Sequence, residues 1–322
     1  MDFQYRKRTL SLVINYLLCK YTNLYMIIRF FKFTKLPQLI VSFLLSIAIM
    51  LILKIDEFSF DILYSSILLI FIFLLSIFII SKNSILKNNQ YTTLGLIIFS
   101  GFIYKTQLNS LTILSYLTLL LSVRKIYSLK TLKKTNKKLF DIGFWFSLST
   151  ILNPVNFIFL ATIFFGIYAF YKLDLKVILQ FFTGYISVLL IAILFTSLSS
   201  SFSFNFVYLV ETLDSFILEF HKCSECPNLS FPQILFPSIS LLVFLLYVFK
   251  YFGKNLHERL KNFFLLIFYL NSILMIFIIE DYTIFLFFPF LVTLIRIISH
   301  LRRSLFFELV IVLAILLNSF SF

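Results

Sequence analysis

The chain has 322 residues, of which 61% are hydrophobic and 13% are charged, and its mean hydropathy is +1.00. A soluble domain carries roughly a quarter charged residues, so this composition excludes an ordinary soluble protein and is typical of membrane proteins. The net charge of +14 alone would suit a nucleic-acid partner. However, the basic residues form short clusters between apolar runs, as the cytoplasmic loops of membrane proteins do. The sequence therefore predicts an all-α polytopic membrane protein with no nucleic-acid partner.

Residues 1–36 form a basic segment that we expect to lie in the cytoplasm. Residues 1–25 fit neither a membrane span nor a signal peptide, because Lys20 interrupts their apolar run and no small-residue cleavage pattern follows. Two interpretations stay open. The one that we favour is a mis-assigned start upstream of Met26, and the other is an interfacial amphipathic helix over 9–28.

Apolar windows without charged residues predict the membrane helices, since about 20 such residues cross the hydrocarbon core. The window at 142–171 is too long for one crossing, because as a single helix it would measure about 45 Å. Asn153-Pro154 also interrupts this window near its middle, and proline breaks or kinks a helix. The other windows are 36–53, 62–81, 88–104, 106–123, 177–210, 226–249, 262–279 and 282–295, followed by an apolar run at 304–322 that only Glu308 interrupts.

The positive-inside rule favours two crossings within 142–171, with a turn at Asn153-Pro154. A single crossing would move every later basic loop to the outside. The nearest rival to the favoured topology is a path in which only the loop 172–176 lies outside. With a cytoplasmic N-terminus, the favoured path leaves three of the 28 Lys and Arg residues outside, namely Lys54, Lys105 and Lys222.

This topology predicts about eleven crossings, with the N-terminus inside and the C-terminus outside. We expect one transmembrane domain over 37–322, whose longest outside loop covers 199–231. The two arms of 142–171 are short for a membrane crossing, so they should pack among neighbouring helices or cross where the bilayer is thin.

Two adjacent carboxylates, Asp56 and Glu57, stand in the first outside loop, "LKIDEFSFD". Paired carboxylates at a membrane surface can serve as a general base or bind a metal ion. The alternative is a solvated acidic loop that only follows the charge topology. We expect any catalytic acid to be one of these two residues.

The run "RKIYSLKTLKKTNKK" at 124–138 holds seven basic residues and no acid. Such a run can bind the phosphates of anionic lipids or a pyrophosphate, and Arg124, Lys125 and Lys130 are the candidates. The alternative is a loop whose charges only set the topology.

Cys223 and Cys226 lie in the stretch "HKCSECP" of the predicted outside loop. In an oxidising periplasm they would form a local disulfide or remain inert thiols. A metal site is a less favoured interpretation, because zinc takes four ligands and only His221 adds to the two thiols. A redox pair is also less favoured, because nearby carboxylates raise the pKa of the thiols.

Glu308 is an intramembrane acid that either has a function or pairs with Arg302 or Arg303. No metal and no cofactor is expected.

The stretch "LLLSVRKIYSLKTLKKTNKKLFDIGFWFSLSTILNPVNFIFL" resembles the core of an uncharacterised polytopic membrane family of Bacteroidota. The closing stretch "IFLFFPFLVTLIRIISHLRRSLFFELVIVLAILL" is similar to that family's last two helices, and the resemblance covers roughly residues 26–322. Members are sometimes labelled carotenoid oxygenases. That activity implies four iron-binding histidines, and this chain has three histidines in total.

The chain also resembles GT-C glycosyltransferases at the level of the fold. The membrane core of those enzymes has short paired helices on either side of a basic cytoplasmic loop, as the segments 88–123, 124–141 and 142–171 do in this chain. This resemblance implies sugar transfer from a polyprenyl-phosphate donor, with Asp56 or Glu57 in the place of the catalytic acid. The outside loop that carries these two residues is much shorter than the loop of those enzymes.

The interpretation that we favour is a multi-pass protein of a bacterial inner membrane, of unknown biochemical activity, that serves envelope biogenesis as a scaffold or through lipid contacts. The alternatives are a GT-C-type transferase and a transporter, for which inverted repeats and midplane charges would be expected. The expected partners are the lipid bilayer and, with it, polyprenyl-phosphate lipids or other envelope proteins.

Overall fold

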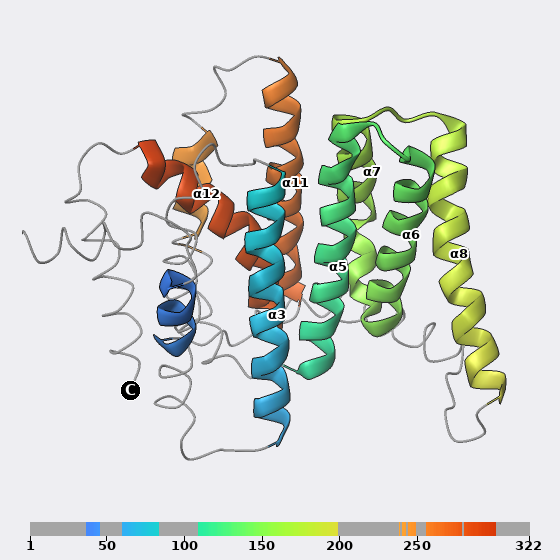
Figure 1. The fold of residues 1–322 in the computed structure, drawn as a ribbon, viewed down its shortest axis with the longest axis horizontal. Coiled ribbons are helices and arrows are strands. Elements are labelled where there is room, and N and C mark those ends of the chain that lie inside the picture. Colours follow the sequence, from blue (N-terminus) through green and yellow to red (C-terminus); the bar gives the residue numbers. More distant parts are fainter. Residues whose placement is uncertain are drawn as a thin grey trace, which may run out of the picture.

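The computed structural model describes residues 37–45, 60–83, 109–198, 238, 240–242, 244–248, 256–278 and 280–300. Within these ranges the chain is all-helical, without a strand, as the composition predicts (Figure 1). The α-helices with defined bounds are α3 (Phe60–Lys82), α5 (Ser110–Ser128), α6 (Thr135–Leu152), α7 (Leu160–Phe170), α8 (Leu175–Leu198), α11 (Leu256–Ile278) and α12 (Phe287–His300). Residues 37–45, 240–242 and 244–248 are helical as well. Three 3-10 helices join them: η2 (Leu129–Thr131), η3 (Pro154–Phe159) and η5 (Glu280–Leu286).

Two of the described helices are long and apolar enough to cross a membrane. They are α3, over Tyr64–Lys82, and α8, over Leu175–Leu194. Shorter apolar helices cover Pro154–Phe170, Asn262–Ile276 and Thr283–Arg296. The helical class is therefore confirmed for this part of the chain, whereas the eleven crossings and their orientation stay predictions.

The chain reverses direction at Asn153-Pro154. Helix α6 ends at Leu152, and Asn153 takes an extended conformation with φ −150° and ψ 102°. The side-chain oxygen of Asn153 accepts a hydrogen bond of 3.2 Å from the backbone N–H of Val155, while Pro154 begins η3. Proline suits this first position because its missing N–H needs no partner there.

Helix α7 then returns to the end of the bundle from which α6 started. The ring of Phe170, at the end of α7, lies 5.0 Å from the ring of Tyr127, at the end of α5. The loops at 129–134 and 171–174 consequently lie at the same end of the bundle, and the Asn153-Pro154 turn lies at the other (Figure 1). The structure thus has the two antiparallel arms expected within 142–171.

Two glycines allow α6 and α8 to approach backbone to backbone. A Cβ atom on Gly143 would lie 2.0 Å from the carbonyl oxygen of Phe181, and one on Gly184 would lie 2.1 Å from that of Phe140. No side chain fits at such distances, and the obstructing atoms belong to the backbone. Small residues serve this purpose at helix crossings in membranes, where close van der Waals packing drives association.

The contact between α5 and α6 is a polar seam within the apolar bundle. The hydroxyl of Ser122 donates to the carbonyl of Ile142 at 3.2 Å, and that of Ser149 donates to the carbonyl of Ser115 at 2.9 Å. The amide nitrogen of Asn156 donates to the hydroxyl of Ser149 at 2.8 Å. Because water is scarce in such a core, these bonds between helices fix how α5 and α6 face one another.

Aromatic side chains fill the space between α5, α7, α11 and α12. Phe285 packs against Tyr116 and Phe159, with ring centroids 4.9 and 5.6 Å apart. The hydroxyl of Tyr116 accepts a hydrogen bond of 3.1 Å from the backbone N–H of Phe288. The predicted span 282–295 begins as the 3-10 helix η5, and α12 starts only at Phe287 because Pro289 fits an α-helix in its first turn.

Candidate functional site

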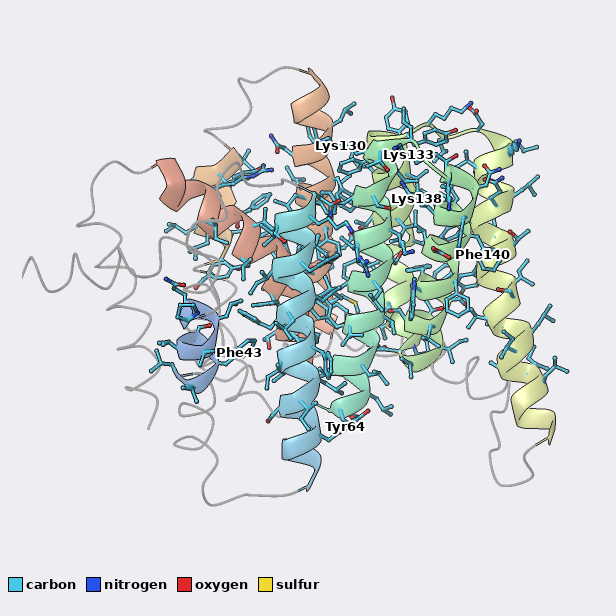
Figure 2. All side chains as sticks on the ribbon, viewed as in Figure 1. Phe43, Tyr64, Lys130, Lys133, Lys138 and Phe140 are labelled. Atoms are coloured by element: carbon cyan, nitrogen blue, oxygen red, sulfur yellow. The ribbon has the colours of Figure 1, made fainter. Side chains whose placement is uncertain are left out.

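Basic side chains gather at the end of the bundle that holds the loops 129–134 and 171–174 (Figure 2). We call this region the basic end and define it by the residues Arg124, Lys125, Lys130, Lys133, Lys134, Lys137, Lys138, Lys172 and Lys176. All three residues that the sequence predicts to bind lipid phosphate, Arg124, Lys125 and Lys130, lie here. Their surroundings differ, and the differences decide which chemistry each can perform.

Arg124 packs on an aromatic ring of a neighbouring helix. Its guanidinium carbon lies 4.5 Å from the centre of the Phe78 ring of α3, and the ammonium of Lys82 lies 5.2 Å from the centre of the same ring. A cation held over an aromatic face is attracted by the negative potential of that face. Arg124 therefore connects α5 to α3.

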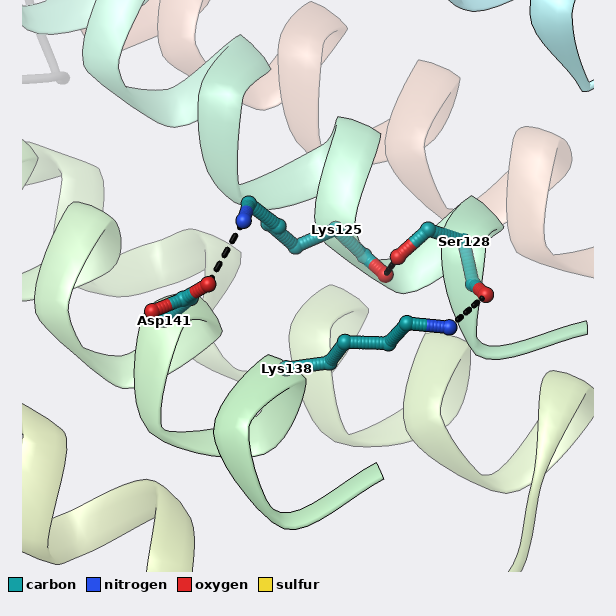
Figure 3. Close-up of polar contacts among 4 residues, drawn as sticks. All are labelled: Lys125, Ser128, Lys138 and Asp141. Carbon is teal, nitrogen blue, oxygen red and sulfur yellow. Dashed lines mark hydrogen bonds and ion pairs between the residues drawn. The ribbon is translucent and has the colours of Figure 1, made fainter. Parts of the chain in front are cut away.

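Lys125 is neutralised within the bundle. Its ammonium lies 2.5 Å from Oδ2 of Asp141 on α6, and the side chains of the two residues are 29% and 22% exposed (Figure 3). Since Asp141 is the only acid between Arg124 and Phe170, this pair removes one positive charge from the basic end and joins α5 to α6.

Lys138 holds the loop between α5 and α6 in shape. Its ammonium donates a hydrogen bond of 2.6 Å to the carbonyl of Ser128 (Figure 3). It donates another of 2.6 Å to the hydroxyl of Thr131. The carbonyl belongs to the last turn of α5, where cations stabilise the unpaired carbonyls of a helix. Partial burial, and then the nearby charge of Lys125, lower the pKa of Lys138.

The loop itself takes a conformation that residues other than glycine seldom adopt. Leu132 has φ 53° and Lys134 has φ 51°, both in the left-handed region. The N–H of Leu132 donates to the carbonyl of Leu129 at 2.9 Å, which closes the turn. The side chain of Leu132 projects outward, and the residue is 64% exposed.

The remaining lysines of this loop are presented to the exterior. Lys130, Lys133, Lys134 and Lys137 are all exposed, and among the described residues no ion pair involves any of them. The second loop of the basic end differs, because Lys172 forms an ion pair with Asp174 that raises the pKa of Lys172 through a hydrogen bond and through charge.

A second polar cluster, which the sequence does not reveal, surrounds Arg296 of α12. The sequence-based topology counts this arginine with the cytoplasmic basic residues, and the structure places it, partly buried, within helix α12. Its guanidinium donates to the hydroxyl of Tyr247, and it donates to Oδ1 of Asn262 at 2.6 Å. The hydroxyl of Tyr247 donates to the same Asn262 oxygen at 2.7 Å. No sequence motif predicts this cluster, because its members lie far apart along the chain.

The other predicted site residues fall outside the described ranges. These are Asp56, Glu57, Cys223, Cys226 and Glu308, together with the segment 1–36 and the loop 199–231. Their proposed roles stay predictions. Among the residues that the structure does describe, no group of three or more His, Cys, Asp or Glu side chains could hold a metal ion.

Comparison of the chain with protein families, with curated proteins and with solved structures gives no match. The functional argument therefore rests on the geometry of this chain.

Proposed function

We propose that the chain is an integral protein of a bacterial inner membrane, with its basic end at the cytoplasmic face, and that it serves envelope biogenesis as a scaffold in contact with anionic lipids. The observation that carries this proposal is the outer surface of α8. The expected partners are lipids that carry phosphate, which include phospholipids and polyprenyl phosphates, and other envelope proteins.

Helix α8 leaves a wide apolar surface uncovered. Its large exposed hydrophobic side chains are Leu175, Leu179, Phe182, Ile186, Leu190, Ile191, Ile193 and Leu194. Each exposed Å² of such surface costs about 25 cal/mol in water, so a soluble monomer rarely keeps a patch of this extent. The lipid core of a bilayer removes this penalty, and a helix already satisfies its own backbone groups there.

The charges of α8 agree with a membrane location. Within Leu175–Leu198 the only charged residue is Lys176, in the first turn, next to the basic end. The positive-inside rule places such an end in the cytoplasm. An apolar helix with cations at one end is the arrangement that anchors a protein in an inner membrane with a single orientation.

An arginine scan along the exposed face of α8 tests whether this face contacts lipid. Ile186 lies midway along α8 and is 49% exposed, while Leu175 lies at its start and is 76% exposed. In a membrane, Ile186→Arg should cost about 2.5–3.5 kcal/mol of insertion free energy. The matched variant Leu175→Arg should be tolerated, because its charge reaches the interface.

The measurement is the fraction of the full chain that stays in the membrane pellet after extraction with alkaline carbonate. The unchanged chain and Leu175→Arg should remain in the pellet, whereas Ile186→Arg should be depleted from it. Recovery of the unchanged chain in the supernatant, or equal behaviour of the two variants, would contradict the proposal.

A further inference from the structure

The seven basic residues of 124–138 divide into two groups that only the structure separates. Three of them have partners within the bundle. Arg124 packs on the Phe78 ring, Lys125 pairs with Asp141, and Lys138 donates hydrogen bonds to Ser128 and Thr131. The four others, Lys130, Lys133, Lys134 and Lys137, are exposed and lie on or directly after one short loop. The first group determines the shape of the loop, and the second group carries its accessible charge.

An apolar side chain lies in the middle of these exposed lysines. Leu132 is 64% exposed, although its neighbours in sequence are the most polar part of the bundle. A left-handed backbone conformation is unfavourable for a side chain such as leucine, and it persists where the surroundings impose it. Here Lys138, which follows the turn, is bonded to Ser128 and Thr131, which precede it, and these bonds hold the turn closed. The loop therefore presents Leu132 and the lysines as one surface.

We propose that residues 130–137 form a binding surface for the headgroups of anionic phospholipids, and we call this surface the lysine loop. Lys130, Lys133, Lys134 and Lys137 contact lipid phosphates, and Leu132 enters the boundary between headgroups and acyl chains. The inference rests on the proposed function, because the loop meets headgroups only if the helices below it cross the bilayer.

Three properties of the lysine loop fit a lipid surface better than an acidic protein or a nucleic acid. Lysine ammonium groups bind phosphate as point charges and need no fixed partner geometry, which suits mobile lipids. No acid lies within 124–138 to repel the phosphates. An exposed leucine between lysines is the combination by which peripheral segments enter a charged interface.

The single tryptophan of the chain provides a direct readout of which lipids lie beside α6. Trp145 is half-buried on α6 and, at 1.5 Å per residue, lies about 12 Å along the helix from Lys137 at the end of the lysine loop. The full chain is reconstituted into vesicles of phosphatidylcholine that contain either brominated phosphatidylglycerol or brominated phosphatidylcholine. Bromine quenches the fluorescence of Trp145 in proportion to the occupancy of adjacent lipid positions.

In low salt the unchanged chain should prefer the anionic lipid by at least about fivefold, which is the effect that a single lysine near a charged surface supplies. The preference should decline at high salt, because exposed charges are screened. The variant Lys130→Gln/Lys133→Gln/Lys134→Gln/Lys137→Gln should lose it. Leu132→Ser should reduce it while the salt dependence remains.

The matched control is Lys172→Gln/Lys176→Gln, which removes charge from the other loop at the same end of the bundle and should keep the preference. Equal loss in the control would show a nonspecific effect of charge and overturn the inference, as would full preference in the fourfold variant. Failure of the proposed function gives a different result, because neither brominated lipid would then quench Trp145 and carbonate would extract the chain.

Discussion

The two ion pairs at the basic end differ in how far their side chains are exposed to solvent. Lys125 and Asp141 are each less than one third exposed, whereas Lys172 and Asp174 are 58% and 50% exposed. Exposed ion pairs contribute little to stability because water and salt screen them, and pairs with partial burial contribute more. The two pairs at one end of the same bundle therefore form an internal comparison.

Asp141→Asn should lower the free energy of unfolding by about 1 kcal/mol, because it leaves the charge of Lys125 unbalanced close to that of Lys138. Asp174→Asn should change it by no measurable amount. Unfolding in detergent micelles, followed by circular dichroism against denaturant concentration, compares the two variants at low ionic strength. Equal effects would mean that the pair between α5 and α6 does not hold these helices together.

Pairs of helices in this bundle are specified by different kinds of contact. Side-chain hydrogen bonds join α5 to α6, close backbone contact joins α6 to α8, and aromatic rings join η3 and α7 to α11. Each kind limits substitution in its own way. A hydrogen bond tolerates another polar group, whereas a backbone contact tolerates no additional atom.

Gly143→Ala and Gly184→Ala should each destabilise the fold by about 1–3 kcal/mol, which is the usual effect of overpacking. Alanine favours a helix over glycine by up to about 1 kcal/mol, so the clash with a backbone carbonyl outweighs the gain. Gly166→Ala is the comparison, because the atoms nearest to its new Cβ belong to the side chains of Phe264 and Ile126 and not to backbone. Its thermal unfolding in detergent should shift least, and an increase in the unfolding temperature of Gly143→Ala would refute the packing account.

In the part of the chain that the structure describes, the two ends of the bundle differ chemically. One end carries the lysine loop, and the opposite end carries the Asn153-Pro154 turn and Phe157, which is 49% exposed. Because the chain reverses at this turn, the two ends must face opposite sides of any membrane that α6 and α7 cross. The difference in charge between the ends is the physical reason for the orientation that we predict.

Cysteine labelling tests that orientation. In a background where Cys19, Cys223 and Cys226 are serine, Lys130→Cys should react with a membrane-impermeant maleimide only after the cells are opened. Phe157→Cys should react in intact cells. Labelling of both positions from the same side would contradict the reversal across the membrane, and an exchange of the two results would invert the predicted orientation.

Residue patterns that act locally could be interpreted without the fold. The apolar windows predict helices because a membrane helix needs about 20 consecutive apolar residues, and α3 and α8 overlap the windows 62–81 and 177–210. The break at Asn153-Pro154 is also predictable, since proline restricts its own backbone and that of the residue before it. The composition alone, with 13% charged residues, indicates the membrane class.

The roles of single charges depended on contacts that cross the chain. Arg124, Lys125 and Lys130 belong to one basic run, yet their environments in the structure differ. Arg124 packs on a ring of α3, Lys125 pairs with a carboxylate of α6, and Lys130 is exposed. The arginine at 296 meets partners that lie 49 and 34 residues away. The sequence by itself determined the helical, apolar character of this protein, because hydrophobicity and proline geometry act within one segment. Only the tertiary structure decided which cations remain accessible, because pairing depends on how separate helices pack against one another.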